Sequence, residues 1–254
     1  MIEIGILCVF AFFAGFIDSI AGGGGLIQLP ALFIFLPHLS VPMLFGTNKL
    51  ASIAGTSLAS IQYARHIEIN WKATLPAACA ALIFSFLGAR ATTIIDPRIM
   101  RPLVLFMLIA IAFYTFIQKD FGTLHAPKLN TIRQYTISIA TGVLIGFYDG
   151  FFGPGTGSFL IFVFIGIFGF NFLSASASSK LINFATNLSA VLYFGFTDNI
   201  FYKAAIFMAL CNMLGSLVGA RLAILKGNRF VRVFFLIIVS ILIIKLGYDI
   251  FVRS

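Results

Sequence analysis

A carboxylate and four consecutive glycines interrupt the long apolar run that extends from Ile4 to Leu36. The interruption reads Asp18-Ser-Ile-Ala-Gly-Gly-Gly-Gly25. A spanning helix needs about 20 apolar residues, so this run is too long for one straight helix. Irregular backbone at membrane depth is tolerated only where it is buried in protein or lines a cavity. We therefore expect a helix over about 4–21, a break at the glycines and a shorter helix over about 26–36. An ionisable residue in such a place indicates a functional site.

The composition places the whole chain in a membrane. Of its 254 residues, 60% are hydrophobic and only 10% are charged, and the mean hydropathy is +1.06, whereas soluble domains carry roughly 25% charged residues. The sequence thus predicts an all-α polytopic membrane protein. Its net charge of +9 comes from lysines and arginines at segment ends, where they anchor helices and set topology. We expect the lipid bilayer, and no nucleic acid, as a partner.

Cysteine usage and the first residues exclude other classes. Cys8, Cys79 and Cys211 lie within apolar segments without CxxC spacing or neighbouring histidines, so no disulfide, metal site or cofactor is expected. Because Met1-Ile-Glu-Ile has no basic region, we interpret the first segment as a retained helix and not as a signal peptide.

The interruption recurs 131 positions later as Asp149-Gly-Phe-Phe-Gly-Pro-Gly-Thr156. At the same offset and without gaps, matching residues include Gly15 and Gly146, Gly22 and Gly153, Gly24 and Gly155, Lys49 and Lys180, Lys72 and Lys203, and Arg90 and Arg221. We infer two internal repeats of about four transmembrane helices each, with a Gly-rich broken or re-entrant element in each repeat. The first repeat spans 1–120, the connector 121–133 and the second repeat 134–254. Broken helices at corresponding positions of two repeats are typical of secondary transporters.

Topology depends on whether the short piece after each glycine loop crosses the membrane. Further helices of the first half are expected over about 48–63, 73–89 and 102–117. Four crossings per half give parallel halves, whose basic turns after Arg90 and Arg221 share a cytoplasmic face; five crossings give inverted halves. Since 26–36 is short for a full crossing, we favour eight crossings in all. Both arginines are interpreted as interface anchors, and Gly215-x-x-x-Gly219 as a packing motif.

The glycine loops are candidate anion sites. Glycine lets the backbone approach a ligand closely, and a helix that begins after such a loop directs unpaired N–H groups and a positive dipole end into it. The alternative is tight helix packing, for which glycine is also used. Four glycines in a row favour an unwound loop over packing, and the absence of a Gly-Lys-Ser/Thr ending excludes a nucleotide P-loop.

Polar stripes follow both loops. Lys49, Ser52 and Thr56 have the spacing of one helical face, as do Lys180, Asn183 and Asn187. Such a stripe suits an anion path; alternatively the small residues join helices by hydrogen bonds, and the lysines, expected near the start of their helices, snorkel to the surface. The candidate substrate-binding residues are Gly22, Gly23, Gly24, Gly25, Asn48, Lys49, Thr56, Gly153, Gly155, Thr156, Ser179, Lys180, Asn183 and Asn187.

Asp18 and Asp149 each precede a loop glycine by four residues and therefore face the loop. Burial disfavours the charged form of a carboxyl, so each could bind a proton during a transport cycle and serve in coupling or gating. Alternatively each forms a static bridge to the lysine of its own or of the other repeat.

Two long stretches resemble the two signatures of the TauE/SafE family of bacterial membrane transporters. They are Gly15 to Pro30 followed by Gly46-Thr-Asn-Lys-Leu50, and Gly146 to Ser158 followed by Ser179 to Asn187. The likeness runs from about residue 10 to 252. It implies a multi-pass permease of the bacterial inner membrane, and the family is associated with sulfite, sulfonates and related organosulfur anions.

The expected function is secondary transport of a small anion, sulfite, sulfonate or another organosulfur anion, with possible proton coupling. An anion channel is the nearer alternative. An intramembrane aspartyl-type enzyme is disfavoured because the Gly-x-Gly-Asp context is absent, as are His-Glu-x-x-His and Gly-x-Ser-x-Gly. We therefore expect no enzyme.

Overall fold

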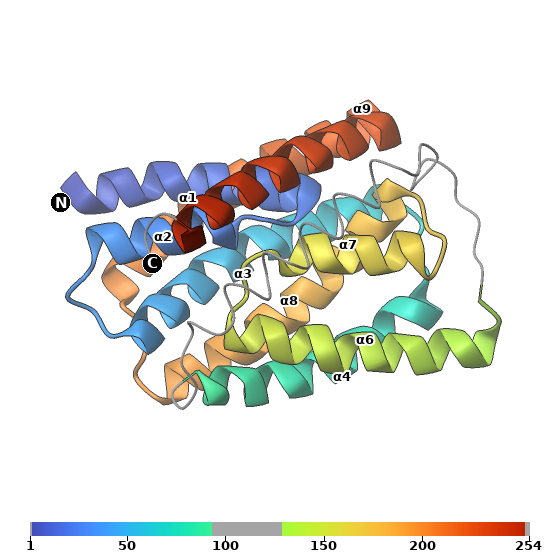
Figure 1. Ribbon diagram of the computed structural model, residues 1–254, viewed down its shortest axis with the longest axis horizontal. Coiled ribbons are helices and arrows are strands. Elements are labelled where there is room, and N and C mark those ends of the chain that lie inside the picture. The colour runs from blue at the N-terminus through green and yellow to red at the C-terminus, as the bar shows by residue number, and fades with distance from the viewer. Residues whose placement is uncertain (1, 93–128, 252–254) are drawn as a thin grey trace.

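The computed structural model describes residues 2–92 and 129–251, and all regular elements within these ranges are helices (Figure 1). The predicted helix over 102–117 and the turn after Arg90 lie outside the described residues. The helices are α1 (Ile2–Ala21), α2 (Gly25–Phe35), α3 (Val41–His66), α4 (Trp71–Ala91), α6 (Thr131–Phe151), α7 (Thr156–Gly166), α8 (Phe172–Phe196) and α9 (Tyr202–Phe251). Three described stretches, Ile2–Ala21, Trp71–Ala91 and Tyr202–Gly227, are long and apolar enough to cross a membrane.

The first broken helix forms as expected. Helix α1 ends at Ala21 and α2 begins at Gly25, because Gly22 takes a positive φ of 73° that only glycine adopts readily. The equivalent break separates α6 from α7, with positive φ at Gly153 and Gly155. Both short helices have 11 residues, too few to span a typical bilayer core.

Helices α3 and α8 begin earlier than the sequence predicted. The Ser40 side chain accepts a hydrogen bond from the Met43 N–H, and Pro42 lies in the first turn; both features start helices. Asn171 caps α8 in the same way through the Ser174 N–H. The expectation that the lysines lie near the start of their helices was therefore wrong, because Lys49 is eight residues beyond the start of α3.

The helices of the two halves correspond in position but run in opposite directions. Helices α2 and α7 have bounds that differ by 131 residues at both ends. Helix α4 runs parallel to α6, since Gly142 lies against Ala77, Gly146 against Ala81 and Gly150 against Ser85. Figure 1 shows α1 running away from the N-terminus at the left, whereas α6 begins at the right. These directions fit inverted halves and do not fit the parallel arrangement favoured above. Whether the halves arose by duplication stays a prediction.

Each half packs its first helix against the last described helix of the other half. Helix α1 lies along α9, and α6 lies along α4. Gly215 abuts the Phe12 carbonyl and Gly219 abuts the Phe16 carbonyl, so a side chain at either position would separate the helices. The predicted packing role of this motif is confirmed. Because each half packs its first helix against the other half, the two glycine loops come together between the halves.

Candidate functional site

The two glycine loops touch backbone to backbone. A Cβ atom at Gly22 would collide with the main chain of Gly157, and one at Gly157 would collide with Gly22. The Ser158 N–H donates to the Gly22 carbonyl at 2.8 Å, and the Ser158 hydroxyl donates to the carbonyls of Ala21 at 2.9 Å and Gly22 at 2.8 Å. Here glycine is required by space as well as by conformation. The break in one half is thus built against the break in the other.

The second loop is held by two side chains of its own half. The Tyr148 hydroxyl donates to the Pro154 carbonyl at 2.6 Å. The Thr156 hydroxyl lies 2.7 Å from Asp149 Oδ1 and 2.6 Å from the Gly153 carbonyl oxygen. Position 25, which corresponds to Thr156 in the first half, is a glycine. The carboxylate of the second half therefore has a hydroxyl partner that the first half cannot supply.

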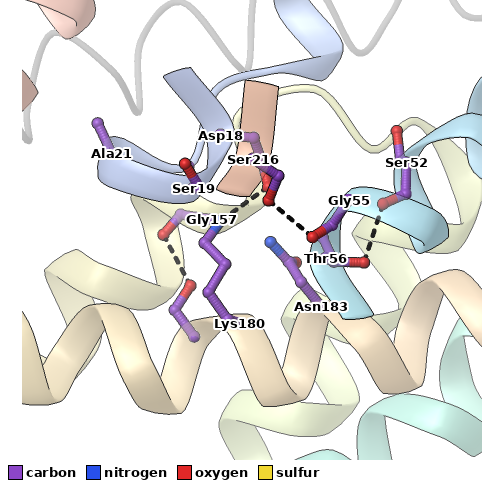
Figure 2. Close-up of polar contacts among 12 residues, drawn as sticks. Asp18, Ser19, Ala21, Ser52, Gly55, Thr56, Gly157, Lys180, Asn183 and Ser216 are labelled. Atoms are coloured by element: carbon purple, nitrogen blue, oxygen red, sulfur yellow. Dashed lines mark hydrogen bonds and ion pairs between the residues drawn. The ribbon is translucent and has the colours of Figure 1, made fainter. Parts of the chain in front are cut away.

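The two lysines cross between the halves to reach the two aspartates. Lys180 Nζ lies 2.8 Å from Asp18 Oδ2, and Lys49 Nζ lies 2.8 Å from Asp149 Oδ2. Figure 2 shows the Lys180 side chain extending from its helix toward Asp18. Both lysines are buried, which excludes snorkelling to the surface. The bridge to the other repeat, one of the alternatives weighed above, is the arrangement present.

The two ion pairs differ in geometry and in access to water. Lys180 donates a hydrogen bond to Asp18, and the Asp18 side chain is 22% exposed while that of Lys180 is 0% exposed. In the other pair both side chains are 4% exposed, and Asp149 Oδ2 has no partner in hydrogen-bond geometry within the described residues. The Lys49–Asp149 contact is therefore an ion pair by proximity that lacks a directed hydrogen bond.

A small cavity of about 30 Å³ lies between the loops. Since one water molecule needs about 10–15 Å³ measured in this way, the cavity has room for roughly two. Its walls are formed by Asp18, Gly22, Gly24, Gly25, Asn48, Lys49, Ser52, Thr56, Asp149, Gly153, Gly155, Thr156, Gly157, Asn183 and Asn187. Most residues singled out from the sequence meet here, but Gly23, Ser179 and Lys180 do not line it. Ser179 instead donates to the Gly157 carbonyl at 3.2 Å.

The polar stripes of α3 and α8 face one another across this cavity. The Asn187 amide donates to the Thr56 hydroxyl at 3.4 Å, and these residues occupy matching positions of the two halves. In Figure 2, Thr56 and Asn183 lie on neighbouring helices around the Lys180 side chain. Asn48 Oδ1 is buried without a hydrogen-bond partner within the described residues, and Asn48 lines the cavity. One amide end is therefore open to a ligand.

Sequence reasoning missed one wall residue and two supporting ones. Gly157 directly extends the second glycine motif, and that adjacency could have indicated it. Gln28 is fully buried in the apolar helix α2; its amide lies 3.4 Å from the Asn48 carbonyl oxygen, and it accepts from Asn212 at 2.9 Å. A lone glutamine in so apolar a helix was the available signal.

Each aspartate at the cavity is neutralised by a lysine. The remaining positive potential comes from the N-terminal ends of two helices. Helices α2 and α7 both begin at the cavity wall, at Gly25 and Thr156. Each helix N-terminus is equivalent to roughly +0.5 charge. Several of the first N–H groups already bond to loop carbonyls, as Leu26 does to Gly23 and Ser158 does to Gly22, so the dipole is the main contribution of these ends. The cavity thus offers about one positive charge beyond the neutralised pairs.

Comparison with known proteins agrees with the resemblance noted in the sequence. Residues 7–246 match the family model described as Sulfite exporter TauE/SafE. The chain is 39% identical to a probable membrane transporter protein, ORF9, of a Sinorhizobium species over 96% of this chain and 92% of that protein. It is 33% identical to a probable membrane transporter protein of Haemophilus influenzae, over 96% and 94% of the respective chains.

A third relative is the probable membrane transporter protein YfcA of Escherichia coli K12, 32% identical over 97% of this chain and 90% of that protein. No solved structure matches the chain. The family match extends over nearly the whole chain and includes both glycine loops and both polar stripes. The protein therefore belongs to the TauE/SafE family of membrane transporters.

Proposed function

We propose that this protein is a secondary carrier for a small sulfur oxyanion, which binds in the cavity between the two glycine loops. The observation that carries the proposal is the convergence of two helix N-termini and the Lys49 ammonium on one buried cavity. Helix N-termini bind oxyanions through backbone N–H groups and the helix dipole. The description of the family as a sulfite exporter supports a sulfur oxyanion. We further propose that the protein resides in the bacterial inner membrane.

The charge balance favours a monovalent anion. The two lysines neutralise the two aspartates, so only the helix ends, together equivalent to about one positive charge, remain for the ligand. Bisulfite and simple sulfonates carry one negative charge. The open end of the Asn48 amide adds a hydrogen-bonding group that could hold a protonated or hydroxyl-bearing oxyanion.

Lys49 is the cation best placed to meet the substrate. It lines the cavity, and its ammonium lies against Gly153 of the opposite loop. An arriving anion would share this ammonium with Asp149, which keeps the Thr156 hydroxyl as a second partner. In this proposal Lys180, which does not line the cavity, holds Asp18 in place.

The cavity has to enlarge during transport. At about 30 Å³ it accommodates roughly two water molecules, whereas sulfite has four heavy atoms. Inverted halves around a central site typically open by rocking one bundle against the other. Release of the Lys49–Asp149 pair would accompany that opening, and protonation of Asp149 or Asp18 would couple the movement to a proton gradient.

Flux into proteoliposomes tests the function. Purified protein is reconstituted, and uptake of labelled sulfite and methanesulfonate is measured against protein-free liposomes, with labelled phosphate and glycine as controls. We expect saturable, protein-dependent flux of the sulfur oxyanions that responds to an imposed pH gradient. Absence of flux for every sulfur oxyanion would refute the substrate assignment, and ohmic single-channel currents in planar bilayers would establish a channel in place of a carrier.

A further inference from the structure

A second concave region lies on the flank of the molecule, away from the glycine loops. It has a volume of about 440 Å³ and is lined by Gln62, Arg65, His66, Leu217, Arg221, Ile224 and Leu225. It lies between the end of α3 and the part of α9 that precedes its break at Gly227. None of its wall residues belongs to the central cavity.

The charged rim of this flank pocket has no internal counterion. Arg65 and Arg221 are both exposed, and neither forms an ion pair within the described residues. The His66 ring Nδ1 contacts the Gln62 carbonyl at 2.8 Å, which fixes the ring against α3. The Gln62 side-chain oxygen is buried without a hydrogen-bond partner in the described part of the chain. The pocket therefore carries two arginines without a counterion among the described residues.

The wall below the rim is apolar and exposed. Leu217, one helical turn before Arg221, is 38% exposed, as expected for a side chain that faces acyl chains. The level of the rim is indicated by Trp71, which begins α4 just beyond the end of α3 and is itself exposed; tryptophan is enriched at the membrane interface. Arginines at interfacial depth above an apolar wall match an amphiphile with an anionic headgroup.

The corresponding place in the other half lacks this combination. Arg221 recurs as Arg90, but Arg65 and His66 correspond to Phe196 and Thr197. Because the halves are inverted, the matching place faces the opposite leaflet. A general anchoring role would be served by Arg90 and Arg221 alike, whereas the clustered rim exists on one side only.

We propose that this flank pocket binds an anionic phospholipid, with the headgroup phosphate between Arg65 and Arg221 and an acyl chain along Leu217. Basic pockets between membrane helices recognise anionic headgroups. The site is independent of the transport proposal, because it shares no residue with the central cavity.

Lipid retention measured by native mass spectrometry tests this site. The full-length protein is released from nanodiscs containing equal amounts of phosphatidylglycerol and phosphatidylcholine with identical acyl chains. Each basic residue at an anionic surface contributes about fivefold to binding, so two arginines predict roughly a 25-fold preference for phosphatidylglycerol. The double variant Arg65→Gln/Arg221→Gln is expected to lose it, and Arg65→Lys/Arg221→Lys to keep most of it.

Lys72→Gln is the matched control, since it removes one exposed charge near the same membrane face outside the pocket. A loss as large in Lys72→Gln as in Arg65→Gln alone would overturn the proposal in favour of general surface charge, as would full retention in the double variant. If the double variant does not fold, competition on the wild type decides. Displacement of the lipid by millimolar inorganic phosphate would overturn the lipid assignment, and undiminished retention would support it.

Discussion

In both lysine–aspartate pairs the lysine nitrogen lies 2.8 Å from a carboxylate oxygen, but the surroundings of the two pairs differ. Lys180 donates a directed hydrogen bond to Asp18, and the Lys180 side chain does not line the cavity. The pair of Lys49 with Asp149 lacks hydrogen-bond geometry, and both its members line the cavity. The fold therefore joins a lysine to an aspartate twice, but only Lys49 lines the cavity and is available to a ligand.

The glycine loops show the same difference between a structural contact and a contact with the cavity. Gly22 of the first loop abuts the backbone of Gly157, which leaves no room for a side chain. A Cβ built on its counterpart Gly153 would lie 3.2 Å from the Lys49 ammonium and the Asp149 carbonyl oxygen and 3.3 Å from Asp149 Oδ1. We infer that the first loop mainly holds the halves together, whereas the second loop faces the substrate. Each prediction below tests this division.

The largest effect is expected from alanine at Gly22 and at Gly153, which both have a positive φ. Gly22→Ala places a Cβ into the opposite backbone, and the left-handed conformation adds about 1–2 kcal/mol, so we expect no monodisperse protein by size-exclusion chromatography. Gly153→Ala carries the same left-handed strain, but its Cβ would lie 3.2 Å from the Lys49 ammonium and the Asp149 carbonyl oxygen, which are tight contacts and not collisions. This variant is therefore expected to be purified in folded form and to bind sulfite about tenfold more weakly. Equal behaviour of the two variants would contradict a division between the loops.

Next in size is the cost of breaking the first ion pair from either side. Asp18→Asn leaves the fully buried Lys180 ammonium unpaired, which costs about 3–5 kcal/mol. Lys180→Met leaves a carboxylate that is 22% exposed, so water offsets part of the loss and roughly half that cost is expected. Thermal unfolding in detergent measures both. A Lys180→Met variant less stable than Asp18→Asn would show that exposure does not govern this pair.

The smallest effect concerns the hydroxyl that only the second half possesses. Thr156→Val removes the contact to Asp149 Oδ1, and a hydrogen bond to a charged group contributes about 1.5–3 kcal/mol. We expect lower thermal stability in Thr156→Val and near-complete recovery in Thr156→Ser. As the matched change in the first half, Gly25→Ser introduces a Cβ at an ordinary 3.4 Å from Pro154, so a shift of under about 1 kcal/mol is expected there.

The sequence was sufficient to predict the broken helices and most of the cavity wall. Gly22 and Gly153 indicated the breaks because only glycine takes their conformation, and the shared offset paired Asp18 with Asp149. The starts of α3 and α8 were missed because each depends on a single capping side chain, Ser40 or Asn171, in a short turn whose conformation is decided by local hydrogen bonds.

The sequence could not predict which aspartate each lysine binds, nor the relative direction of the two halves. Which aspartate each lysine reaches depends on the crossing of the halves, and the sequence alone left the lysine of the same and of the other repeat equally open. The opposite directions of α1 and α6 were missed because short helices such as α2 were taken as too short to count as a crossing. Gln28 escaped notice because a single polar residue in an apolar helix has no periodic pattern.

The central claim is that Lys49 binds the anion and does not merely neutralise Asp149. Equilibrium sulfite binding to purified Asp149→Asn and Lys49→Met/Asp149→Asn tests it most directly, because neither variant leaves an unpaired buried carboxylate at this position. We predict that Asp149→Asn binds sulfite at least as tightly as the wild type, since its ammonium is released from the carboxylate, and that the double variant loses detectable binding. Equal affinity in the two variants would contradict the claim and would reduce Lys49 to a structural counterion.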